Sequence, residues 1–154
     1  MPTAWRIAKK KLESSAFDGE GARLFGGRWN SIGYRMVYTA SSQSLAALEI
    51  MVHVSRPALL QKYVALGIEI PSNFIETTDP KKLPKDWLAS PPPTKLQEIG
   101  DKWVRNGSSV VLAVPSAVIP GEINFLLNPA HADFATLLIA KPVRFEFDKR
   151  LAAD

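Results

Sequence analysis

One acidic side chain, Glu49, lies in an otherwise apolar stretch from Ser44 to Val54. Burial of an unpaired carboxylate is costly, so such an acid is either paired or used. A carboxylate in this setting can stabilise an oxocarbenium-like centre or hold a ribose hydroxyl, as carboxylates do at glycosidic bonds. The structural alternative is a helix-surface acid that pairs with His53, four residues further on. The apolar neighbours favour the functional interpretation.

A second candidate, Arg28, lies upstream of Glu49 in the glycine turn Gly26-Gly27-Arg28-Trp29-Asn30. A guanidinium on such a loop can bind phosphate or ribose oxygens through two parallel hydrogen bonds. The alternative is a surface arginine beside a turn that Trp29 anchors in the core. The spacing of the glycines matches neither the dinucleotide-binding motif nor the P-loop.

Tyr38, Ser116 and His131 are weaker candidates on their own. Tyr38 is typical of a half-buried strand residue, but in a pocket its ring could stack on a planar group. Ser116 directly follows an apolar segment, where loop side chains often meet ligands. Its alternative is a turn or cap serine, because no histidine is adjacent to suggest a nucleophilic serine. His131 could cap, pack or bind, and the sequence does not decide between these roles.

Composition restricts the class of protein. The 154 residues suit one domain with a single core. The absence of cysteine excludes disulfides, thiolate zinc sites and a cysteine nucleophile. The chain has two histidines, which argues against a histidine-rich metal site. We expect a cytoplasmic protein, because no signal-peptide region and no run of about 18 apolar residues is present.

The chain is mildly basic, with 19 basic against 15 acidic residues and a net charge of +4. The lysine runs Lys9-Lys10-Lys11 and Lys81-Lys82 are not interleaved with aromatic residues, as a platform for single-stranded nucleic acid would be. We therefore interpret them as solvated surface rather than as a nucleic-acid footprint.

The elements that would position these residues alternate irregularly, which predicts a mixed α/β or α+β single domain. Alternation or strand-forming residues predict strands at 5–8, 36–40, 63–70, 109–114 and 143–147. Helices are expected at 45–54, 94–106 and 132–138, the first capped within Ser41–Ser44 and packed through Leu45, Leu48 and Val52. The prolines and lysines of Asn73–Pro93 predict a surface excursion.

Taken together, the motifs resemble those of the RES domain, a toxin family named for its Arg, Glu and Ser. The matching segments are Gly26–Asn30, Val37–Ala40, Ser44–Glu49 with Val52-His53, Val114–Ser116 and Asn124–His131. They occur in the family's order and span nearly the whole chain, so that residues 1–154 would form one RES domain. Each segment is weakly specific alone, but their order and spacing together are fairly specific.

The resemblance implies an α+β fold similar to that of ADP-ribosyltransferases, with NAD+ bound in a central cleft of a split β-sheet. It implies that Arg28 holds the phosphate or ribose side of NAD+ and that Tyr38 faces the nicotinamide. Glu49 would engage the nicotinamide ribose and support cleavage, while Ser116 would help to shape the nucleotide site. Asn124 is counted with the NAD+-binding residues.

The resemblance also implies a toxin of a type II toxin–antitoxin pair that depletes NAD+ by cleaving its nicotinamide–ribose bond. NAD+ would be the substrate, with no further cofactor and no metal, and an Xre-type antitoxin would be the partner. No nucleic-acid or membrane partner is expected for this chain alone. The acceptor of the ADP-ribose stays open between water, phosphate and a protein side chain, as does a homodimer.

Two other functions compete with NAD+ depletion. One is mono-ADP-ribosylation of a specific protein target in the same pocket. The other, from a different class, is a non-catalytic module that binds nucleotides or nucleic acid, suggested by the net charge and the lysine runs. Salt-sensitive binding to DNA or RNA without NAD+ turnover would distinguish the binding module.

Overall fold

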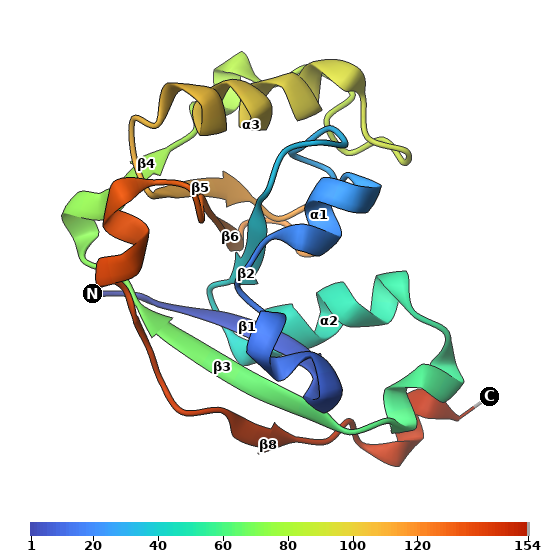
Figure 1. Cartoon of the computed structure of the whole chain (residues 1–154). Helices are drawn as coiled ribbons and strands as arrows, with labels where there is room; N and C mark the ends of the chain where they lie inside the picture. Colours follow the sequence, from blue (N-terminus) through green and yellow to red (C-terminus); the bar gives the residue numbers. More distant parts are fainter. Residues whose placement is uncertain (154) are drawn as a thin grey trace.

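The protein, described here by a computed structural model of residues 1–153, is built on one eight-stranded sheet (Figure 1). The strands are β1 (Thr3–Lys9), β2 (Val37–Ala40), β3 (Tyr63–Glu69), β4 (Ile75–Thr77), β5 (Val111–Pro115), β6 (Ile123–Leu127), β7 (Leu138–Ile139) and β8 (Val143–Phe145). Their order is β4-β5-β6-β2-β1-β3-β7, and β8 also pairs with β3. Only β4 and β5 are parallel. The predicted mixed α/β fold class is confirmed.

Residues 1–153 also contain three α-helices and six 3-10 helices, of which all but the last lie between strands. The α-helices are α1 (Glu20–Phe25), α2 (Gln43–His53) and α3 (Thr94–Asn106). The 3-10 helices are η1 (Lys10–Ser15), η2 (Arg56–Leu60), η3 (Ser72–Phe74), η4 (Pro80–Lys82), η5 (Ala132–Thr136) and η6 (Lys149–Ala152). No helix within residues 1–153 is long and apolar enough to cross a membrane.

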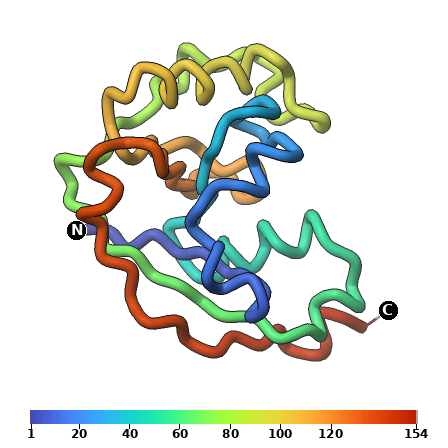
Figure 2. Tube along the Cα trace, in the orientation of Figure 1, coloured from blue at the N-terminus to red at the C-terminus, as the bar shows by residue number. Residues whose placement is uncertain are grey.

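The sheet narrows sharply between β1 and β2. These strands share a single register pair, Trp5 with Ala40, whereas β1 pairs with β3 along its whole length of 7 residues. We call the Trp5–Ala40 pair the waist. It joins one half-sheet of β1, β3, β7 and β8 to another of β2, β4, β5 and β6, and it is where the split expected from the resemblance lies (Figure 1). The chain ends lie on opposite sides of the molecule (Figure 2).

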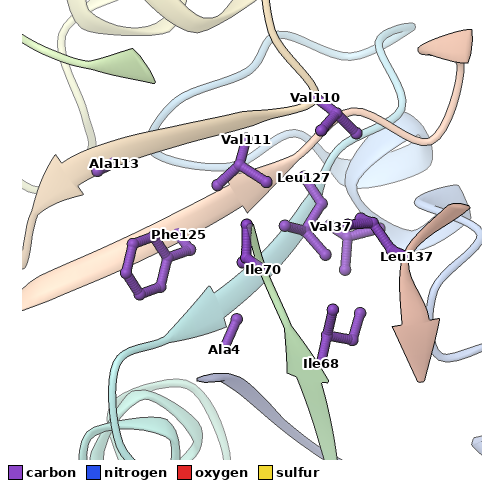
Figure 3. Close-up of a cluster of buried hydrophobic side chains, with 10 residues drawn as sticks. All are labelled: Ala4, Val37, Ile68, Ile70, Val110, Val111, Ala113, Phe125, Leu127 and Leu137. Atoms are coloured by element: carbon purple, nitrogen blue, oxygen red, sulfur yellow. The ribbon is translucent and has the colours of Figure 1, made fainter. Parts of the chain in front are cut away.

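Buried side chains from both half-sheets pack together next to the waist (Figure 3). Ala4, Ile68 and Ile70 come from the β1–β3 half, and Val37, Val111, Phe125 and Leu127 from the other. Separate clusters fix a helix to each half: α2 packs on β1 and β3, and α3 packs on β2, β5 and β6. The two helices therefore cover different halves of the sheet.

Helix α2 has the predicted N-cap but not the predicted packed stripe. The Ser42 hydroxyl accepts a hydrogen bond from Leu45 N at 3.1 Å, which begins the helix. Of the predicted stripe, Leu45 is buried, but Val52 is 60% exposed and Leu48 is not among the packed residues. The helix instead packs through Leu45, Ala46, Ala47, Ile50, Met51 and Val54. The prediction overlooked the alanines, whose small side chains allow the helix to lie close to the sheet.

The predicted surface excursion at residues 73–93 contains no buried residue, but part of it joins the edge of the sheet. Residues Ile75–Thr77 form β4, which adds a parallel edge strand to β5. Leu83 and Trp87 further on pack against the cluster beneath α3. The prolines fall outside this short strand, so the segment can join the sheet edge without losing ladder hydrogen bonds.

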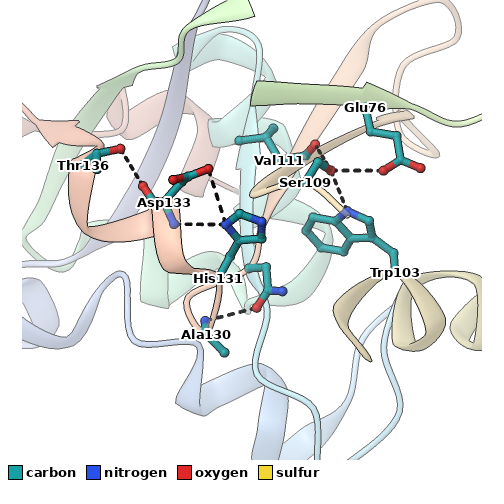
Figure 4. Close-up of polar contacts among 9 residues, drawn as sticks. Glu76, Trp103, Ser109, Val111, Ala130, His131, Asp133 and Thr136 are labelled. Carbon is teal, nitrogen blue, oxygen red and sulfur yellow. Dashed lines mark hydrogen bonds and ion pairs between the residues drawn. The ribbon is translucent and has the colours of Figure 1, made fainter. Parts of the chain in front are cut away.

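The C-terminal region differs from its prediction in element type. The segment predicted as a helix at 132–138 is the 3-10 helix η5 followed by β7. His131, whose role the sequence left open, caps η5 because its Nδ1 accepts from Asp133 N at 3.0 Å (Figure 4). Elsewhere in Figure 4, the Trp103 indole donates to Ser109 Oγ at 2.8 Å, which ties α3 to the start of β5.

Helix α3 has its predicted bounds and ends at Gly107, which adopts φ of 59°. Its central glycine, Gly100, is buried directly against the turn that carries Arg28. A Cβ atom at Gly100 would lie 1.7 Å from the carbonyl oxygen of Trp29. The helix and the turn therefore touch backbone to backbone.

We predict that Gly100→Ala lowers the free energy of unfolding by about 3 kcal/mol or more, because the added methyl group has no space unless α3 moves off the turn. Gly21→Ala in α1 is the matched control, since a Cβ there meets no atom within 4 Å. Denaturant unfolding of both variants measures the difference. Equal stabilities for the two variants would contradict the close contact.

Candidate functional site

Arg28 lies at the tip of a tight turn between α1 and β2. Gly26 enters the turn with φ of 72°, and Gly27 N donates to Asn30 O at 3.0 Å. The Arg28 Nη1 donates to the carbonyl oxygens of Trp87 and Ala89, each at 2.9 Å. Residues 84–92, which we call the strap, are thus bound to the turn by the predicted anion-binding side chain. Arg28 is half-buried, and part of its guanidinium is already engaged.

The Tyr38 hydroxyl is enclosed by the same turn. It donates to Asn30 Oδ1 at 2.6 Å and accepts from Trp29 N at 3.0 Å. Burial raises the pKa of this hydroxyl well above its ordinary value, so it stays neutral at physiological pH. A Cβ at Gly27 would come within 2.5 Å of the hydroxyl oxygen, which explains why glycine is needed there. With the hydroxyl committed to the turn, the ring is the part of Tyr38 that can meet a ligand.

Glu49 on α2 is half-buried and forms no salt bridge within residues 1–153. Burial raises the pKa of its carboxyl group, and this effect outweighs the opposing effects of a hydrogen bond with Asn124 and of the charges of His53 and Arg28. Arg28 also acts on the pKa of Tyr38. The structure therefore brings the three predicted residues Arg28, Tyr38 and Glu49 into one electrostatic environment.

Asn124 on β6 lies next to this group. It pairs with Ala40 in the sheet, and its Nδ2 donates to Thr39 O at 3.1 Å. The Asn124 side chain also lowers the pKa of Glu49, against the larger effect of burial. Asn124 is therefore a neighbour of the Glu49 carboxylate, and its predicted role in binding NAD+ stays a prediction.

Ser116 has the local structural role that its sequence alternative described. Its buried Oγ accepts from Val118 N and Ile119 N, each at 3.0 Å, and its own N–H donates to Glu122 O at 2.8 Å. These bonds close the loop after β5. These bonds are all local, and the predicted role of Ser116 in shaping the nucleotide site stays a prediction.

Arg6 on β1 belongs to the same region, although the sequence reasoning did not single it out. Its Nη1 donates to Tyr38 O at 2.9 Å, just past the waist, where β1 and β2 no longer pair. Burial lowers the pKa of Arg6, an effect that the charge of Asp18 partly opposes. Its Nε is buried without a hydrogen-bond partner among residues 1–153. The signal was present in the sequence, because an arginine within the apolar segment 4–8 is as unusual as Glu49 in α2.

The arrangement has the components needed to bind a dianionic ligand beside a carboxylate. Arg6 and Arg28 supply positive charge, the Tyr38 ring supplies a flat apolar surface, and Glu49 supplies a carboxylate in partly apolar surroundings. Perturbed pKa values of Arg6, Tyr38 and Glu49 within one region are typical of functional sites.

Comparison with known proteins shows the family of the chain and the similarity of its fold. The RES domain family matches residues 3–148. The chain is 44% identical over 148 residues to "Toxin Res" of Photorhabdus laumondii, covering 96% of this chain and 95% of that protein. It is 36% identical over 152 residues to "Prs ADP-ribosylating toxin" of Sphingobium, covering 96% and 94%. The fold is similar to that in the crystal structure of the M. tuberculosis MbcT–MbcA toxin–antitoxin complex, with a TM-score of 0.75, 20% identity and coverage of 98% and 86%.

We predict that Glu49→Gln keeps or raises the stability of the fold at neutral pH. An acid whose pKa is higher in the folded chain than its ordinary value of 4.5 destabilises the folded state once it is ionised. The stability difference between the variant and the wild type should therefore be absent below about pH 4 and grow as the pH rises through the raised pKa.

Thermal melts of both proteins between about pH 4 and pH 8 measure this difference. Glu98→Gln, which removes an exposed acid on α3, controls for the change in net charge. A large loss of stability in Glu49→Gln at pH 7 would mean that Glu49 has a structural role.

Proposed function

Because this chain belongs to the RES domain family, we propose that it is the toxin of a toxin–antitoxin pair and that it depletes NAD+ by cleaving the nicotinamide–ribose bond. The observation that carries the proposal is the convergence of Arg6, Arg28, Tyr38 and Glu49 beside the waist. The family membership and the toxin names of the relatives support it.

The proposed binding mode assigns each group of NAD+ to a side chain of matching chemistry. The diphosphate takes the guanidinium groups, and its oxygens complete the hydrogen bonding of Arg6, whose Nε has no partner within residues 1–153. The nicotinamide ring lies on Tyr38, and the adjoining ribose faces Glu49. Asn124 is a polar neighbour of Glu49 that favours its ionised form.

The proposed reaction breaks the bond between C1′ of the ribose and the nicotinamide nitrogen. The bonding electron pair leaves with nicotinamide, which departs as a neutral molecule, and positive charge develops on the ribose. The ionised Glu49 carboxylate stabilises that charge in partly dehydrated surroundings. Water or phosphate then adds to C1′ and loses a proton to solvent, so no strong general acid is required.

We predict that the purified chain releases nicotinamide from NAD+ and that Glu49→Gln reduces the rate by roughly 100-fold or more, because a neutral amide cannot balance the developing charge. Release by the wild type should decline as the pH falls through the raised pKa of Glu49, where the carboxylate is lost.

Nicotinamide is measured by chromatography, with and without phosphate, and the mass of the second product identifies the acceptor. Glu98→Gln serves as the active control. Absence of nicotinamide release under both conditions would overturn the proposed function, and an unchanged rate in Glu49→Gln would remove Glu49 from its role.

A second candidate function, ADP-ribosylation of a specific protein, is favoured by the name of the Sphingobium relative. It uses the same site and the same bond cleavage, but a side chain of the target protein attacks C1′. We predict that labelled NAD+ added to cell lysate with the purified chain leaves all proteins unlabelled if the toxin depletes NAD+. A discrete labelled protein that disappears with Glu49→Gln would instead establish the transferase.

We further propose that the chain acts in the cytoplasm and is held inactive by an antitoxin of the Xre type. An enzyme that consumes NAD+ is harmful to the cell that makes it, so an inhibitor is required. The toxin–antitoxin complex of similar fold supports such a partner. The net charge of +4 and the arginines of the site favour an inhibitor whose contacting segment is acidic.

A further inference from the structure

Helix α3 presents two polar side chains to the Arg28 turn, one helical turn apart. Gln97 and Asp101 lie four residues apart, so they share a face of the helix, and Gly100 lies next to them. All three contact backbone of the segment 27–31. The hydrogen bonds of Gln97 and Asp101 go to residues of the turn and not to the side chains that would bind substrate.

Gln97 binds both ends of the turn. Its Nε2 donates to Gly27 O at 2.9 Å and to Asn30 O at 3.2 Å. Asn30 O also accepts from Gly27 N at 3.0 Å, so the same atom closes the turn and is held by the helix. Both hydrogens of the Gln97 amide are therefore used to fix the two residues that bracket Arg28 and Trp29.

Asp101 fixes the residue that follows the turn. Its two carboxylate oxygens accept from Ser31 N at 2.8 Å and from Ser31 Oγ at 2.6 Å. Together with the contact between Gly100 and Trp29, these bonds hold the turn at both ends and in the middle. The backbone from which the Arg28 side chain extends is thus held by α3.

The same bonds reach Tyr38. Asn30, whose carbonyl Gln97 holds, accepts the Tyr38 hydroxyl proton through its Oδ1 at 2.6 Å. Asn30 is fully buried, and its Nδ2 donates to Ala22 O at 2.8 Å, so the residue cannot shift alone. These side-chain bonds of Asn30 do not involve Gln97, so the support of the Tyr38 hydroxyl remains when Gln97 no longer holds Asn30 O.

We propose that Gln97 is a positioning residue for NAD+ binding, which fixes the turn of Arg28 from helix α3 through Gly27 O and Asn30 O. The inference rests on the proposed function for its substrate. Arg28 is assigned to the phosphate or ribose side, away from the bond that breaks, so its displacement weakens substrate and transition state equally. The effect of Gln97 therefore falls on KM rather than on kcat.

The first test is Gln97→Met, which keeps the length of the side chain but removes both donors. We expect the KM for NAD+ to rise roughly tenfold, because one to two lost neutral hydrogen bonds correspond to a factor of about that size. The kcat should be nearly unchanged. Hydrogen exchange followed by mass spectrometry should show faster exchange of the amides in segment 27–31, with other regions unaffected. Glu98→Gln, on the exposed side of the same helix, is the control for both measurements.

The second test is Gln97→Glu, which has the same shape but offers no donor when ionised. Its carboxylate repels the two carbonyl oxygens, whereas its protonated form can donate to one of them. The ratio of its KM to that of the wild type should therefore fall as the pH is lowered from about 7.5 to about 5. Gln97→Met should show a ratio that does not change with pH.

Unchanged KM and unchanged exchange in Gln97→Met would overturn the inference, as would a fall in kcat with KM unaltered. Wild-type protein that releases no nicotinamide would overturn the proposed function instead. The exchange measurement needs no substrate, so it would then decide alone whether Gln97 positions the turn.

Discussion

The structure around the site depends on one close contact, in which the backbone of α3 at Gly100 lies against the carbonyl group of Trp29. Because no side chain separates helix from turn, the turn is held as firmly as the helix itself. The Tyr38 hydroxyl then fills the space beneath Gly27 and bonds to Asn30 and Trp29. Helix, turn and strand become one interlocked unit, and the direction of Arg28 is a result of packing in the interior.

Two charged side chains of the candidate site, Arg6 and Glu49, lie in apolar surroundings. Arg6 extends from β1, and Glu49 from the helix that packs on that strand. Burial opposes the charged form of both, so both reduce the stability of the fold. Neither forms a salt bridge within residues 1–153. Such unpaired charges are retained where a bound ligand or a reaction uses them.

Local signals in the sequence were sufficient for several elements. Helix α3 begins after Pro93 and ends at Gly107, and α2 begins at a serine cap, because these residues act through their own backbone neighbourhood. Strands β4 and β6 were not predicted, since β4 has only 3 residues and β6 is followed directly by Asn128-Pro129. Both strands are defined by their pairing with β5, and for β4 that partner lies far away in the sequence.

Residue types in the sequence indicated candidate site residues, but they did not indicate the contacts of those residues. Arg28 acts on the pKa of both Tyr38 and Glu49. Nothing in the sequence indicated that Arg28 would hold the carbonyl groups of the strap. The composition of residues 73–93, which include the strap, predicted a surface excursion and left its role open. Arg6 was not predicted as a site residue, because strand alternation is weak evidence for the direction of a single side chain. Contacts between residues about sixty positions apart need the fold itself.

The waist affects how the two half-sheets are held together. Paired residues of neighbouring strands fix the relative orientation of the parts of a sheet. Here a single pair connects two half-sheets, each of which carries a helix. Buried side chains from both half-sheets share one cluster beside this pair. The relative orientation of the two halves is therefore set more by side-chain packing than by backbone hydrogen bonds, so a change of volume in this cluster becomes a change in that orientation.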